Sequence, residues 1–306
     1  MNHLDLVSTT HGVPHPPPPR RGRVQDSLFS RLLVAVLILA GSGLLLYPSA
    51  ASWFTAVNQA AVIEEYHAAV VDADPADLAR QLRRAKTYND ALSAGALLDA
   101  DARKPQGNGV SSDPSLDYDT LLDPTGTGVM GHVRIPSIDV DLPVFHGTGD
   151  ETLRRGAGHL EGSHLPVGGP GTHAVIAAHR GLPEGQMFDD LGQVEPGDRF
   201  SLEVLGEVLT YEVREARVVE PDDTDELRPE RGKDLVTLVT CTPLGVNSHR
   251  ILVTGERVDT PVADTEELRA PVAEAGFPFW AVGAVAALLL AVAYLLVTRR
   301  RQHQSG

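Results

Sequence analysis

Two long stretches of the chain carry apolar residues without a single charge. They cover residues 32–54 and 277–297. Each has about the twenty residues that a helix needs to cross a lipid bilayer, so both predict membrane-spanning helices. A cleaved signal peptide is the alternative for the first stretch, although only the small residues at 49–51 resemble a cleavage site.

Arginines lie at the outer ends of both apolar stretches. Arg20, Arg21 and Arg23 precede the first stretch, and residues 299–301 after the second are all arginine. Positive charges next to a membrane span favour the cytoplasmic side. We therefore expect a cell-membrane protein with both termini in the cytoplasm and residues from about 55 to 275 outside the cell.

The polar segment after the first apolar stretch has helical periodicity. Apolar residues recur at Val57, Ala61 and Ile63, and again around Leu78 and Leu82. Between these two groups, Asp74 and Pro75 have the features of a helix N-cap and a first-turn proline. The pattern predicts a helical hairpin, followed by a linker rich in glycine, serine and proline.

From residue 129 the pattern changes to short apolar or alternating runs separated by turns. Such runs, with few helices between them, predict an antiparallel or mixed barrel or sandwich of about 130 residues. The runs are VMGHVRIP, VDLPVFHG, THAVIAAH, RFSLEVLGEVLTYEVREARVVE, LVTLVTC and HRILVTGERV.

The charge balance narrows the classes of function. The chain has 26 Lys and Arg against 41 Asp and Glu, a formal net charge of −15. A nucleic-acid-binding protein normally presents a basic face, so no nucleic-acid partner is expected. The balance fits an acidic soluble surface or a substrate that carries a cation.

Cys241 is the only cysteine of the chain, and Arg250 follows it nine positions later (250 − 241 = 9). Outside the cytoplasm a single cysteine indicates a reactive thiol or a link to another chain, while a buried structural cysteine is the alternative. If the runs that hold Cys241 and Arg250 pair as neighbouring strands, thiol and guanidinium lie side by side at a strand end. Arginine cannot accept a proton, so another residue must act as the acid or base.

Histidines supply the candidates for proton transfer. His159, His164, His173 and His179 are close in sequence, and only His179 ends a strand-like run, as Cys241 does. The other three are expected to be turn or surface histidines. Zinc is the rival interpretation, but the spacings fit no compact ligand pattern and no second cysteine is present. We therefore expect no metal and no cofactor.

The motifs around these residues resemble those of the sortase family of cell-surface transpeptidases. TLVTC at residues 237–241, HR at 249–250 and AAHRG at 177–181 carry the resemblance, together with GVMGHVRIPSIDVDLPVFHGT from Gly128. The segments from residue 113 to 258 look like the class C, pilin-polymerising branch. The resemblance implies a mainly β fold, a closed barrel of about eight strands with short helices, preceded by the helical hairpin and flanked by the two membrane helices.

The resemblance also implies roles for individual residues. Cys241 matches the family's nucleophile, His179 its catalytic histidine and Arg250 its catalytic arginine, and Thr240 is expected at a substrate subsite. The implied reaction cleaves a Leu-Pro-x-Thr-Gly-like sorting signal between Thr and Gly through a thioacyl enzyme. Pilins and surface proteins are the implied substrates, and a pilin lysine is the acceptor amine.

Class C relatives carry a lid ahead of the barrel, and Asp113, Pro114 and Ser115 match its position. Asp113 is expected to pair with Arg250. Ser115 is at the position where the family has a large aromatic ring, so Tyr118 is a candidate to replace that ring. The alternative to a lid is a plain Asp-Pro turn in the linker. A housekeeping sortase that anchors proteins to peptidoglycan, and a membrane-anchored binding module without activity, are the rival functions.

The expected organisation has eight parts. They are a cytoplasmic tail (1–30), a membrane helix (31–52), a helical hairpin (53–100), a linker with the lid (101–127), a catalytic barrel (128–262), a second linker (263–276), a second membrane helix (277–298) and a basic cytoplasmic tail (299–306).

Overall fold

The computed structural model describes residues 28–92, 116–183, 185–223, 225–272 and 275–303, with side chains as far as residue 300. The chain divides into two compact units. One comprises residues 1–42 and 286–306, and the other comprises residues 43–285. The lid residues Asp113, Pro114 and Ser115 lie outside the described residues.

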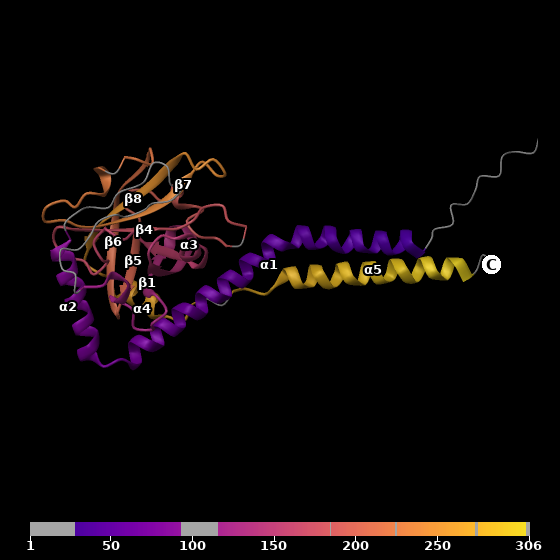
Figure 1. Cartoon of the computed structure of the whole chain (residues 1–306), viewed down its shortest axis with the longest axis horizontal. Helices are drawn as coiled ribbons and strands as arrows, with labels where there is room; N and C mark the ends of the chain where they lie inside the picture. The colour runs from indigo at the N-terminus through magenta and orange to yellow at the C-terminus, as the bar shows by residue number, and fades with distance from the viewer. Residues whose placement is uncertain (1–27, 93–115, 184, 224, 273–274, 304–306) are drawn as a thin grey trace, which may run out of the picture. The chain divides into compact units, whose positions relative to one another are not determined.

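The larger unit contains a closed eight-stranded barrel, as expected (Figure 1). The strand order around the barrel is β1-β2-β3-β4-β7-β8-β6-β5, and β1 pairs with β5 to close it. The pairs β2–β3 and β4–β7 are parallel and the others antiparallel. The strands are β1 (Val129–Ile135), β2 (Val140–His146), β3 (Ala157–His159), β4 (Thr172–Ala177), β5 (Arg199–Val204), β6 (Glu207–Val219), β7 (Asp234–Thr242) and β8 (His249–Val258).

Alternation along the strands fills the barrel with apolar side chains. The main core takes Val236 and Leu238 from β7 and Val253 from β8, whereas Val239 and Leu252 belong to a second cluster on the opposite face. Successive side chains of a strand point to opposite faces of the sheet, so β7 and β8 each supply both clusters. The short β3 is the strand that the sequence pattern did not predict.

Short helices connect the strands. They are α3 (Asp150–Arg155), α4 (Val262–Arg269) and the 3-10 turns η1 (Tyr118–Thr120), η2 (Pro136–Ile138), η3 (Leu191–Gln193) and η4 (Asp225–Leu227).

The first helix, α1 (Leu28–Asp72), is longer than the sequence boundaries suggested. A membrane helix ending near residue 52 and a separate hairpin arm were expected, but one 45-residue helix includes both. Helical periodicity continues past the apolar stretch, and the interior Pro48 does not end the helix. Asp74 then caps α2 (Pro75–Ala91), its carboxylate accepting the Ala76 N–H at 2.8 Å. This N-cap and the first-turn Pro75 are as predicted.

Two described helices have the length and apolar composition of a membrane span. They are α1 and the apolar part of α5 (Phe279–His303), Phe279–Arg300. These helices correspond to the two stretches that the sequence pattern singled out.

Candidate active site

Cys241 and Arg250 are direct partners in the β7–β8 ladder. The nine-residue separation therefore corresponds to an antiparallel hairpin whose two strands end opposite each other, as the sequence predicted. Directly opposed residues have Cβ atoms about 4.5–5.5 Å apart. The pairing brings a thiol and a guanidinium together at one end of the barrel.

His179 follows the end of β4, the strand that pairs in parallel with β7 on the other side. The Ala178 N–H donates to the carbonyl of Val239 at 3.1 Å, and the Thr240 hydroxyl donates to the carbonyl of Ala178 at 2.8 Å. One residue further on, Arg180 donates from Nη1 to the Thr242 hydroxyl at 2.9 Å. Because contacts to β7 hold the residues on both sides of His179, its backbone lies beside Cys241.

The three residues also share one face of the sheet. Val175 and Ala177 of β4, Val239 of β7 and Leu252 of β8 all belong to the second apolar cluster. Continuing the alternation along each strand places His179, Cys241 and Arg250 on that same face. The sequence could predict the strand ends, but their meeting depends on the parallel β4–β7 pair.

Arg250 is held in place by backbone carbonyls. Its side chain is almost completely buried, with 1% of the residue exposed. Nη1 donates to the carbonyls of Asn247, at 3.0 Å, and His249, at 3.1 Å. Asn247 has a φ of 57°, in the left-handed region that asparagine tolerates better than most residues. The loop conformation thus aims a carbonyl at the guanidinium.

Two influences act on the Cys241 thiol. Burial raises its pKa, because a partly apolar surrounding disfavours the thiolate, and the nearby Arg250 charge lowers it by a smaller amount. The net shift is upward, so in this arrangement Arg250 alone does not make the thiol a strong nucleophile at neutral pH. A base beside the thiol would activate it, and the backbone of His179 lies next to Cys241.

Thr240 stays a predicted substrate-subsite residue, and the structure adds a contact of its side chain. Its side chain is buried, with 2% of the residue exposed, and its hydroxyl binds the carbonyl of Ala178. The structure thus gives Thr240 a positioning contact, between β7 and the residue before His179.

Tyr118, the alternative ring for the lid, is buried. It packs against Tyr88 and His146, and its hydroxyl binds both Nδ1 of His159, at 3.0 Å, and the Gly147 N–H, at 3.0 Å. These contacts tie η1 to the barrel.

The prediction of turn or surface histidines was wrong for His159 and His173. Both are buried, with 0% and 1% of the residue exposed. His159 lies between the Tyr118 hydroxyl and the carbonyl of His164, and His173 lies between the carbonyl of Arg228 and the Thr237 hydroxyl. Burial lowers the pKa of His159 to about 3 and that of His173 to about 4, so both are neutral side chains that satisfy polar groups.

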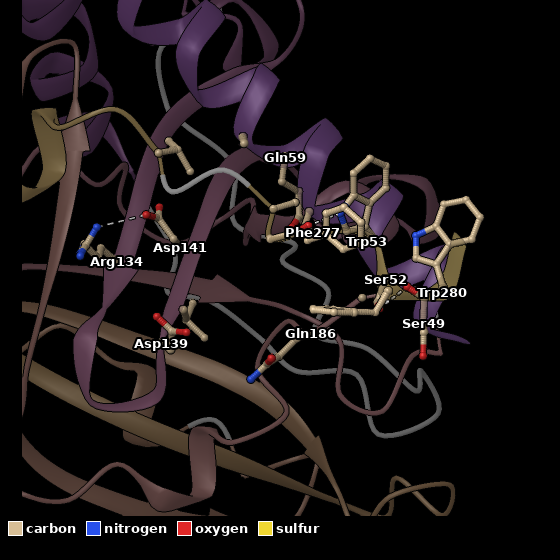
Figure 2. Close-up of a pocket in the computed structure, with 18 of the residues that line it drawn as sticks. Ser49, Ser52, Trp53, Gln59, Arg134, Asp139, Asp141, Gln186, Phe277 and Trp280 are labelled. Carbon is tan, nitrogen blue, oxygen red and sulfur yellow. Dashed lines mark hydrogen bonds and ion pairs between the residues drawn. The ribbon is translucent and has the colours of Figure 1, made fainter. Parts of the chain in front are cut away.

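A cavity of about 620 Å³ lies elsewhere in the larger unit (Figure 2). It is lined by the α1 side chains of Trp53 and Gln59, by Arg134 and Asp141 of the β1–β2 hairpin, and by Trp280. Cys241, His179 and Arg250 are not among its lining residues. The candidate active site is therefore separate from this cavity. It lies at a strand end where Arg250 is buried and His179 and Cys241 are partly exposed.

Several known proteins are similar to this chain in fold and in sequence. A family model described as a sortase domain matches residues 133–258. Sortase D of Bacillus subtilis is 30% identical over 163 residues, covering 51% of this chain and 79% of the relative. The crystal structure of sortase C-1 from Actinomyces oris is 46% identical, covers 61% of this chain and 100% of its own, and has a TM-score of 0.55. Sortase C of Streptococcus pneumoniae is 38% identical, with 66% and 99% coverage and a TM-score of 0.57.

The relatives that share this closed mixed barrel are sortases, which are cysteine transpeptidases. With a relative 30% identical over most of its length and a sortase-domain match, the chain belongs to the sortase family. Its solved structural neighbours include class C sortases.

Proposed function

We propose that this protein is a membrane-anchored class C sortase that polymerises pilin subunits, with Cys241 as nucleophile, His179 as proton carrier and Arg250 as electrostatic partner. The observation that carries the proposal is the direct pairing of Cys241 with Arg250, with His179 held beside them by β4. The structural neighbours include two C-type sortases, which supports the pilin branch. One of these structures is described in connection with pilin substrate specificity.

The first half-reaction forms a thioester. Sγ of Cys241 attacks the threonine carbonyl carbon of the Leu-Pro-x-Thr-Gly-like signal, and His179 takes up or holds the thiol proton. The C–N bond to glycine then breaks as His179 gives a proton to the leaving amine. Arg250 faces the same strand end, where its fixed charge stabilises the oxyanion of the tetrahedral intermediate.

The second half-reaction transfers the acyl group. A neutral lysine amine of the next pilin attacks the thioester carbonyl and gives its proton to His179. The C–S bond breaks, so Sγ of Cys241 leaves the acyl carbon as a thiolate and takes back the proton that His179 holds. An isopeptide bond joins the two subunits, and the enzyme returns to its starting protonation state.

The loop between the two paired residues offers apolar surface for the signal. Leu244 and Val246 are 56% and 69% exposed although both are hydrophobic. Exposed apolar residues beside a reactive group suit a peptide with an apolar first residue. The lid of Asp113, Pro114 and Ser115 remains a prediction from the resemblance.

The two apolar helices support the proposed location, with the barrel outside the cytoplasm and both termini inside. In this orientation the barrel and the proposed sorting signal are on the same side of the membrane.

The test uses the full chain in detergent with a Leu-Pro-x-Thr-Gly peptide and either a pilin lysine peptide or a peptidoglycan-type amine. We expect mass spectrometry to detect a thioacyl adduct on Cys241, lost in Cys241→Ala, and transfer to the lysine peptide. Preferred transfer to the peptidoglycan-type amine would favour the housekeeping alternative. Adduct and product formation by Cys241→Ala would refute the proposed nucleophile.

A further inference from the structure

A second cluster of reactive side chains lies away from Cys241, between α1 and the outer face of the barrel. It consists of His67 on α1, His132 on β1 and Glu203 on β5, and we refer to these three residues as the His67 cluster. Each offers a ligand atom, and these atoms all lie within 4.8 Å of one another. Within the described ranges, it is the one group of three or more His, Cys, Asp or Glu side chains that close together.

The barrel itself brings two of the three side chains together. His132 and Glu203 are direct partners in the β1–β5 ladder that closes the barrel. Their neighbours Val133, Leu202 and Val204 belong to the main core, so alternation points His132 and Glu203 outward. Helix α1 then covers them: 2% of His132 and 3% of Glu203 are exposed.

Helix α1 supplies the third side chain from a position held by its neighbour. The Tyr66 hydroxyl donates to the carbonyl of Met130 at 3.3 Å and accepts the Leu205 N–H at 2.7 Å, next to the strand positions of His132 and Glu203. His67 thus follows a residue that is bound to both strands. The His67 and His132 rings lie edge to face, with centroids 5.6 Å apart.

The cluster contains one ion pair and one unpaired nitrogen. Nε2 of His67 and Oε2 of Glu203 form an ion pair at 2.9 Å, whereas Nδ1 of His132 has no hydrogen-bond partner among the described residues. A buried polar atom without a partner is destabilising, and such atoms are rare in native proteins. A cation bound by all three side chains would give Nδ1 of His132 a partner beside the His67–Glu203 ion pair.

An outer carboxylate completes the pattern. Nε2 of His132 contacts Oδ1 of Asp141. The other oxygen, Oδ2, accepts a hydrogen bond from Nη1 of Arg134 at 3.3 Å (Figure 2). The contact with Asp141 leaves Nδ1 as the nitrogen of His132 that is available for a ligand. A histidine that binds a metal through one nitrogen and a carboxylate through the other is the usual arrangement of protein metal sites.

We propose that the His67 cluster binds a divalent cation of the Zn²⁺ type through His67, His132 and Glu203, and so fastens the membrane-proximal helix α1 to the barrel. Two imidazoles and one carboxylate suit Zn²⁺, whereas Ca²⁺ and Mg²⁺ prefer oxygen ligands. In a filled tetrahedral site the ligand atoms are about 3.4 Å apart, so small side-chain rotations close the present spacing. Because His67 is 15% exposed in its side chain, water can reach the fourth position from the helix side.

The sequence pattern did not reveal the His67 cluster, because its three residues belong to segments that are far apart in the chain. The sequence pattern predicted no metal, an expectation that rested on the histidines between 159 and 179. The cluster proposed here contains none of them.

The experiment measures metal binding by the full chain in detergent, in a Cys241→Ala background that removes the only thiol. Zn²⁺ is titrated calorimetrically, with Ca²⁺ as the comparison, and metal content after dialysis is measured by mass spectrometry. We expect one Zn²⁺ per chain, no comparable binding of Ca²⁺ and a higher Tm with Zn²⁺. Absence of Zn²⁺ binding would overturn the proposal, leaving the His67 cluster as an ion pair.

Variants then locate the site. His67→Gln should weaken Zn²⁺ binding at least 100-fold and abolish the shift in Tm, and Asp141→Asn should weaken it about 10–100-fold. His249→Gln is the matched control, since His249 is exposed, and it should bind as the background does. Equal affinity in His67→Gln and His249→Gln would place the metal elsewhere and refute the site.

A spectroscopic experiment tests the site without any substitution in the His67 cluster, so it remains informative if such a variant fails to fold. Co²⁺ in place of Zn²⁺ should give the strong visible absorption of a four-coordinate site in the Cys241→Ala chain. A weak spectrum of hexa-aqua type would count against the site.

Discussion

Burial and the charge of Arg250 have opposite effects on the pKa of the Cys241 thiol. Burial raises its pKa, and the paired Arg250 lowers it by less. Arg250 is itself buried and bound to two backbone carbonyls, which hold its guanidinium at the strand position opposite Cys241. At the scale of the residue, these contacts determine the surroundings of the thiol and of its paired guanidinium.

Arg250→Ala should lower kcat/KM for sorting-signal cleavage by about 10²–10³, the usual loss when a preorganised oxyanion-stabilising group is removed. Arg250→Lys should restore only part of the rate, because lysine keeps the charge but not the planar guanidinium fork. Steady-state assays with the signal peptide measure both. Arg228→Ala, which alters an exposed arginine, is the control. A normal rate in Arg250→Ala would remove Arg250 from the mechanism.

The pH dependence of Cys241 alkylation follows from the shift in its pKa. The thiolate fraction rises as pH rises through the pKa, so a raised pKa moves the labelling profile to higher pH than that of a free cysteine peptide. Arg250→Met removes the contribution that lowers the pKa and should move the profile further in the alkaline direction. Rates of iodoacetamide labelling between about pH 6 and 11 measure this. A shift of the Arg250→Met profile to lower pH would contradict the assigned influence.

At the scale of elements, polar contacts join the helices to the barrel. Asn89, near the end of α2, forms two hydrogen bonds with the backbone of Leu165: its Nδ2 donates to the carbonyl at 3.0 Å, and its Oδ1 accepts the N–H at 2.7 Å. Asn89 and Leu165 are both buried. The Asn89 side chain thus satisfies both backbone groups of Leu165, as a neighbouring strand would do. Leu165 lies in the loop between β3 and β4, and β4 leads to His179.

Asn89→Ala should destabilise the larger unit by about 2 kcal/mol or more, because it leaves two buried backbone groups without partners. Thermal unfolding followed by circular dichroism measures the loss, and hydrogen exchange at the Leu165 amide should become faster. Lys86→Ala, an exposed change on the same helix, should alter neither. Unchanged exchange at Leu165 in Asn89→Ala would show that the contact does not protect that amide.

Much of the element structure could be predicted from local pattern. The runs that became β1, β2 and β4 to β8 were visible as alternation, and Asp74 and Pro75 marked the start of α2 correctly. The three-residue β3 was missed because it is too short to show a period. The length of α1 was also missed, since a change from apolar to polar residues marks a change of environment and need not end a helix.

At the scale of the whole molecule, two apolar helices lie near the two ends of the chain, and the catalytic barrel lies between them in sequence. In the proposed orientation the arginine-rich ends remain in the cytoplasm. This arrangement gives a prediction that does not depend on activity.

Single cysteines introduced into the Cys241→Ala background should reveal the orientation. Asp222→Cys, at an exposed position of the barrel unit, should react with a membrane-impermeant maleimide in intact cells whose wall has been removed. Ser305→Cys, in the C-terminal tail, should react only after the membrane is permeabilised. Labelling of Ser305→Cys in intact cells would contradict a cytoplasmic C-terminus.

The sequence alone determined the features that depend on neighbouring residues. Charge-free apolar length, strand alternation and the hairpin spacing of Cys241 and Arg250 are local, so the chain displays them before it folds. The contacts between distant segments were decided by the tertiary structure. The parallel β4–β7 pair brings His179 to Cys241, the core buries His159 and His173, and the β1–β5 pair under α1 assembles His67, His132 and Glu203. These meetings join residues far apart in the chain, and local periodicity carries no information about which distant strands become neighbours.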